Sequence, residues 1–106
     1  MEVLEKKEHY NQLFDYYQKL LTTKQQEIFE DYYANDFSLG EIAENNNISR
    51  NAVFDTIKKV EKILDNYEEI LKLVEKNHLL IEYLDELENE VTSQGQLIIN
   101  KIKEME

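Results

Sequence analysis

The side chains best suited to chemistry lie in one short stretch and are of the kinds that contact nucleic acid. An arginine can contact a phosphate or a guanine edge, lysines neutralise backbone phosphates, and a serine at a helix start helps to hold a phosphate. Such residues recur between positions 49 and 62, where the candidate nucleic-acid-binding residues are Ser49, Arg50, Asn51, Lys58, Lys59 and Lys62. Their types predict binding to RNA or DNA rather than catalysis.

Residues that would support catalysis or metal binding show no suitable spacing. The chain has no cysteine, and its two histidines, His9 and His78, lie far apart in the sequence. A zinc site needs three or four ligands at close spacing, and a phosphate-binding loop needs glycines that this sequence lacks. Adjacent acids such as Glu68 and Glu69 point to different sides of a helix. We therefore expect no enzyme activity, no metal and no cofactor.

The composition favours an all-α fold. The 106 residues include no proline and only two glycines, whereas strands joined by tight turns would need more of both. No apolar run approaches the roughly 20 residues that cross a bilayer, and the first residues lack the apolar block of a signal peptide. We expect one cytoplasmic domain of residues 1–66, followed by an acidic helical extension of residues 67–106.

Residues 38–60 have the pattern of a helix-turn-helix. A short first helix leads into a turn at Asn47, where asparagine tolerates left-handed backbone angles, and Ser49 caps the second helix. Val53 and Ile57 are four residues apart, so they share an inner face that we expect to pack against the small Ala43. The joint would leave the candidate residues outside. Phe54 also falls outside, and we expect another helix of the chain or of a dimer to cover it.

Flanking segments are expected to be helical as well. Residues 3–20 form one apolar stripe, and a second helix begins at a Thr22 or Thr23 cap, with Gln26 or Glu27 near the capping-box position, and ends at Tyr33. Ser38 caps the next helix, with Glu41 three residues later. Beyond the motif, apolar residues follow a heptad-like spacing that 77–78 could interrupt, and Gly95 predicts a break before a last helix.

The extension presents an apolar seam that must be covered. It could pack as core within the chain or pair with a second copy, and we favour a homodimer because the first four helices can already close a small core. The residues expected to form this dimer or tail packing are Ile63, Tyr67, Ile70, Val74, Ile81 and Leu84.

Charge is distributed unevenly along the chain. The formal net charge is −11, which argues against a strong general nucleic-acid binder. Residues 38–66 carry only −1 of it, against −4 for residues 1–37 and −6 for residues 67–106. A local patch of lysines can act over the 8–10 Å or so that salt leaves unscreened. However, a patch with so few cations would bind a phosphate backbone only weakly.

Several spaced segments resemble a known family. Leu21 to Gln25, Tyr32 to Ala43 and Ile48 to Lys58 resemble region 4 of bacterial sigma factors, and resemble still more closely the small acidic helix-turn-helix proteins of the YlxM family. The likeness is strong over roughly residues 10–70. Asn46 departs from it, because an apolar residue normally precedes the turn.

This resemblance implies a cytoplasmic bacterial protein, dimeric and all-helical, with a regulatory or accessory role. The family is linked to the signal recognition particle because its genes neighbour those of the particle's GTPase protein and its receptor. The partner would then be the particle's RNA or its GTPase protein. Two alternatives stay open: a DNA-binding transcriptional regulator, and a protein-interaction module that uses its acidic tail.

Overall fold

A computed structural model describes residues 2–105, and all of its regular structure in that range is helical. The helices are α1 (Val3–Tyr17), α2 (Thr23–Tyr33), α3 (Leu39–Asn46), α4 (Arg50–Leu71), α5 (Leu73–Leu87) and α6 (Ser93–Lys103), with short 3₁₀ turns η1 (Gln18–Leu20) and η2 (Glu88–Glu90). The expected all-α class is confirmed. The chain forms two compact units, Met1–Lys72 and Leu73–Glu106.

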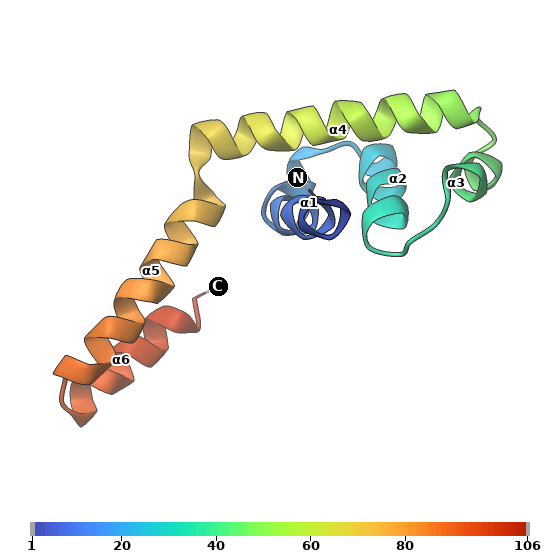
Figure 1. The fold of residues 1–106 in the computed structure, drawn as a ribbon. Coiled ribbons are helices and arrows are strands. Elements are labelled where there is room, and N and C mark those ends of the chain that lie inside the picture. The colour runs from blue at the N-terminus through green and yellow to red at the C-terminus, as the bar shows by residue number, and fades with distance from the viewer. Residues whose placement is uncertain (1, 106) are drawn as a thin grey trace. The chain divides into compact units, whose positions relative to one another are not determined.

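In the first unit, the long helix α4 packs against α1, α2 and α3 (Figure 1). Apolar residues recur at helical spacing along its inner face, and three of them, Val53, Val60 and Leu64, are completely buried. Aromatic rings from α1 and α2 fill the space beneath it. The rings of Phe14 and Phe29 stack with centroids 5.4 Å apart. This core holds the outer face of α4 toward solvent.

Helix starts in this unit follow the capping rules that the sequence indicates. Ser38 accepts a hydrogen bond from the backbone N–H of Glu41, whose carboxylate accepts one from the N–H of Ser38, as predicted. The cap of α2 is Thr22, but its partner is Gln25 rather than the expected Gln26 or Glu27. The prediction of the partner was wrong by one position, because the capping box counts three residues from the cap itself.

The joint between α3 and α4 is built as the motif requires. Ala43, Val53 and Ile57 are all buried, which confirms the predicted inner face. Asn47 ends α3 with φ of 55°, in the left-handed region that asparagine tolerates, and the N–H of Ile48 donates to the carbonyl oxygen of Ala43.

Asn46 fills the position where an apolar residue was expected, and its side chain forms two hydrogen bonds. Its amide donates to the carbonyl oxygen of Ile42 at 2.8 Å, and its amide oxygen accepts from the ammonium of Lys24 at 3.0 Å. Hydrogen bonds to α3 and α2 therefore tie down the turn in place of an apolar contact.

Helix boundaries in the remainder of the chain differ from the expected ones. Helix α4 runs through residue 66, where a domain boundary was expected, and ends at Leu71; the next residue, Lys72, adopts φ of 55°. Helix α5 then continues through Asn77 and His78, so the interruption considered there does not occur. As a result, the six residues of the predicted seam fall on two helices that belong to different units.

The second unit is a helical hairpin. Lys103 of α6 forms ion pairs with Asp85 at 2.8 Å and with Glu88 at 2.6 Å. The hydrogen bond that Lys103 donates to Glu88, and then one from Gln96, lower the pKa of Glu88. Gly95 does not precede α6 but lies in its first turn, so that prediction was also wrong. A Cβ on Gly95 would lie 2.7 Å from the Cβ of Val91, which explains the glycine by close packing.

Candidate nucleic-acid interface

The outward face of α4 carries all but one of the predicted nucleic-acid-binding residues, and its cap supplies the other. Each side chain in the set is exposed: Ser49, Arg50, Asn51, Lys58, Lys59 and Lys62. They form two groups along the helix, one at its start and one that begins eight residues later, about 12 Å along the axis. The exposed Asp55 lies between the groups and places a negative charge on the same side of the helix.

The first group forms the N-terminal end of α4. The hydroxyl of Ser49 accepts a hydrogen bond from the N–H of Ala52 at 3.0 Å, so its predicted role as a cap is confirmed. Arg50 lies beside the start of α3, where a Cβ on Gly40 would be 4.0 Å from its Nε. Among residues 2–105, Arg50 has no carboxylate within ion-pairing distance. Its guanidinium therefore carries an uncompensated positive charge.

The second group is the basic patch, which we define as Lys58, Lys59 and Lys62. Lys58 and Lys62 are four residues apart and occupy one face of the helix, with Lys59 beside them. Lys58 pairs with Glu61 at 3.3 Å. Lys59 and Lys62 form no ion pair with any residue in the described range, so their charges remain available.

Glu61 lies beneath the patch and is the one charged residue classed as buried in the described chain. It accepts a hydrogen bond from the hydroxyl of Tyr33 and pairs with both Lys58 and Lys6, the latter at 3.7 Å. Burial, then this hydrogen bond, raises the pKa of Tyr33. The carboxylate thus connects α1, α2 and α4 and holds two ammonium groups near the surface.

Lys6 was missed by the sequence analysis. It belongs to α1, more than 50 positions from the patch, and only the shared carboxylate of Glu61 brings the two together. Nothing in the spacing of α1 could have found it. Its place beside Lys58 extends the basic surface beyond α4.

A second polar network joins α1 to the further end of the patch. Asp65 accepts a hydrogen bond from the hydroxyl of Tyr10 at 2.7 Å, and one of its oxygens lies 3.1 Å from Nε2 of His9. Burial, then the bond to Asp65, raises the pKa of Tyr10. Asp65 is therefore engaged with α1, and its charge is shared with those groups rather than with Lys62.

Phe54 does not have the cover that was expected for it within the chain. Its side chain is 46% exposed, and the ammonium of Lys58 lies 5.5 Å from the centre of its ring. With Leu39, Arg50 and Asn51 it lines a shallow open depression at the helix-turn-helix surface. An exposed aromatic ring thus separates the start of α4 from its basic patch.

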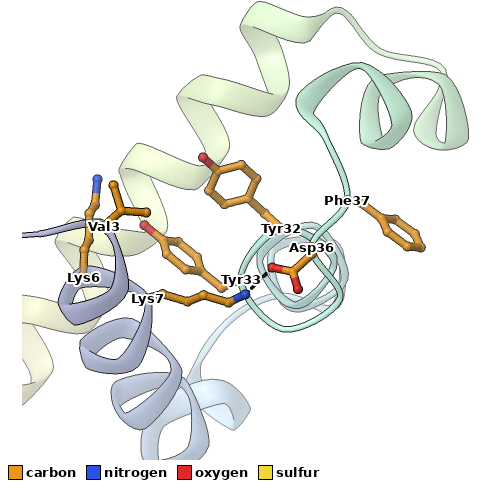
Figure 2. Close-up of a pocket in the computed structure, with 7 residues that line it drawn as sticks. All are labelled: Val3, Lys6, Lys7, Tyr32, Tyr33, Asp36 and Phe37. Carbon is orange, nitrogen blue, oxygen red and sulfur yellow. Dashed lines mark hydrogen bonds and ion pairs between the residues drawn. The ribbon is translucent and has the colours of Figure 1, made fainter.

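A separate pocket lies where the start of α1 meets the end of α2. It measures about 350 Å³, and Figure 2 shows Lys7 directed toward Asp36, with which it forms an ion pair, beside Tyr32 and Tyr33. Asp36 is the one acid that lines this pocket, and it is paired with Lys7. The lining residues therefore include no pair of carboxylates of the kind used in acid–base catalysis.

Residues 2–105 contain neither a metal-binding cluster nor a membrane-spanning helix. No group of three or more histidine, cysteine, aspartate or glutamate side chains is placed to hold a metal ion. No helix in that range combines the length and the apolar character needed to span a membrane.

Comparisons with known proteins agree with this geometry. Residues 4–105 match the model of the UPF0122 family, described as "Putative helix-turn-helix protein, YlxM / p13 like". A UPF0122 protein of Lactococcus lactis subsp. cremoris is 46% identical over 97% of this chain and 92% of its own length. YlxM of Bacillus subtilis is 55% identical over 69% of this chain and 66% of its own. The chain therefore belongs to the UPF0122 family of YlxM-like helix-turn-helix proteins.

Proposed function

We propose that this protein is a non-enzymatic, regulatory nucleic-acid-binding protein and that the outer face of α4 contacts duplex DNA. The observation that carries the proposal is the pair Lys59 and Lys62, exposed and without a carboxylate partner on the outward side of a capped second helix. In helix-turn-helix proteins this helix enters the major groove, and its first residues contact base edges.

Several features favour DNA over duplex RNA. The major groove of B-form DNA admits an α-helix, whereas that of A-form RNA is too deep and narrow. Arg50 and Asn51 stand at the start of α4, where side chains of this motif contact bases. The lysines farther along would neutralise phosphates and position the helix without recognising sequence. Asp55 and the acidic remainder of the chain weaken non-specific binding.

The test is a salt titration of DNA binding by the Lys59→Ala/Lys62→Ala double variant. Each lost phosphate contact makes the plot of log affinity against log salt shallower by about one unit, so we expect a loss of about two. The control is Lys76→Ala/Lys101→Ala, which removes the same charge from two exposed lysines of the second unit. Equal slopes in wild type and the first variant would refute the proposal.

The family resemblance adds an expectation about cellular context. A role beside the signal recognition particle would make the particle's RNA or its GTPase protein a partner. The same titration addresses the RNA, since the structured RNA can compete with duplex DNA at matched salt. If the RNA displaces the duplex, the particle's RNA is the better candidate partner.

We further propose that the protein is a homodimer that pairs through α5. The second unit is shorter than the roughly 40 residues below which a fold usually needs disulfides, metals or oligomerisation. Three apolar residues of α5, at spacings of three and four, remain 45%, 60% and 46% exposed: Leu80, Tyr83 and Leu87. Val74 and Leu84 of the predicted seam are instead buried, and Ile81 is half-buried. A partner helix would cover the exposed stripe.

A further inference from the structure

We infer that Phe54 recognises the 5-methyl group of thymine in the DNA major groove. The inference rests on the proposed function, and it adds a base preference to the DNA-binding face. Phe54 lies in the second turn of α4, on its outer side, with an exposed ring. An apolar side chain at such a position can contact a base edge only where that edge is itself apolar, and the thymine methyl is the apolar group of the major groove.

The surroundings of the ring suit DNA better than another apolar protein surface. The depression that it lines also contains Arg50 and Asn51, and the ammonium of Lys58 lies 5.5 Å from the ring centre. These three polar or cationic side chains would have to be desolvated against an apolar partner. Against DNA they meet phosphates and base edges instead. A phenylalanine ringed by such groups therefore fits a groove that offers both phosphates and a methyl group.

Neighbouring residues indicate which base pair is contacted. Asn51 precedes Phe54 by three positions, so the two side chains are adjacent on the helix surface. Asparagine can form two hydrogen bonds to adenine, through N6 and N7. A helix start with Asn51 and Phe54 side by side thus matches a site that contains A·T pairs. Since uracil lacks the methyl group, the same contact distinguishes DNA from RNA.

The test removes single methyl groups from the DNA. A duplex is first selected from a random-sequence pool with the full-length protein, and each thymine in it is then replaced singly by deoxyuridine. At one or more positions we expect the affinity of wild type to fall about fourfold, the effect of losing one buried methyl group. The same replacement should leave the affinity of Phe54→Ala unchanged. Leu20→Ala, which alters an exposed apolar residue in η1, should behave as wild type.

The outcomes separate the two proposals. If duplexes bind with the expected salt dependence but every uracil replacement is neutral, the thymine contact is refuted and the DNA-binding face stands. If replacement weakens Phe54→Ala as much as wild type, another residue contacts the methyl group and the inference is wrong. If no duplex is selected, both proposals fail. Because Phe54 is exposed, the variant should keep the melting temperature of wild type, which circular dichroism checks.

Discussion

At the scale of single residues, Glu61 couples the stability of the first unit to the charge of its surface. It is buried, accepts a hydrogen bond from the hydroxyl of Tyr33, and pairs with Lys6 and Lys58. Buried carboxylates are tolerated only when they are paired and hydrogen-bonded, and each of these conditions is met here. The negative charge of Glu61 also offsets part of the positive charge of Lys6 and Lys58.

Replacing Glu61 by glutamine should separate these two roles. Glu61→Gln keeps an oxygen that can accept from Tyr33 but loses the charge, so the free energy of unfolding should fall by about 1–3 kcal/mol. Removing a negative charge beneath the patch should also strengthen DNA binding at low salt by about two- to fivefold. Chemical denaturation and a binding titration measure the two effects. Glu69→Gln, an equal charge change at an exposed position of α4, should leave stability unaltered. Weaker DNA binding by Glu61→Gln would contradict this account.

The sequence indicated the exposed lysines of α4 but not the residues that support them. Lys58, Lys59 and Lys62 are recognisable because helical spacing alone separates them from Val53 and Ile57. Lys6 and Tyr33 are not, since they reach Glu61 only through the packing of three helices. Phe54 was placed correctly on the outer face, and only cover from within the chain is absent. Long-range side-chain contacts have no local sequence pattern from which to infer them.

At the scale of helices, the beginnings were predictable and several of the ends were not. Ser38 and Ser49 cap their helices because a serine before an apolar run satisfies the free N–H groups of the first turn. Asn47 was expected to turn the chain, as it does. The helix end at Lys72 could not be predicted from the sequence, because lysine has no special tolerance for the left-handed conformation that it adopts. The break therefore falls at Lys72 rather than at Asn77 and His78, the polar pair that could have interrupted the tail.

The turn of the motif offers a direct test of this local control. Asn47→Ala should lower the free energy of unfolding by about 1 kcal/mol, because alanine pays more than asparagine for φ of 55°. Asn47→Gly should cost nothing measurable or stabilise slightly, since glycine adopts this conformation without a steric penalty. Asn45→Ala, within α3, is the matched control and should not destabilise the protein. Equal stability of the two Asn47 variants would show that the left-handed turn carries no cost.

At the scale of the whole molecule, the two units differ in what they can bury. In the first unit, α4 packs against three helices, and the apolar side chains of its inner face are buried. The second unit is a single hairpin, and it leaves several of its large apolar side chains exposed. A heptad-like spacing in the sequence indicated that an apolar seam exists, but not which apolar residues of α5 remain exposed. That choice depends on how α6 packs against α5, which no local pattern determines.

The proposed dimer can be tested by charging the exposed stripe. In Leu80→Glu/Leu87→Glu, like charges would meet across a paired seam, so sedimentation equilibrium should show wild type at twice the chain mass and the variant at the mass of one chain. Glu82→Ala/Glu86→Ala alters two exposed positions of the same helix as a control and should remain dimeric. A monomeric wild type at micromolar concentration would contradict the pairing.

The most direct test of the central claim maps the surface of the protein that meets DNA. Amide chemical shifts of ¹⁵N-labelled protein would be recorded during titration with a selected duplex at low salt. We predict that the largest changes occur at residues 49–62, on the outward side of α4, and at Lys6 on α1. Changes confined to residues 73–105, or an absence of any change at residues 49–62 in a saturated complex, would contradict the account.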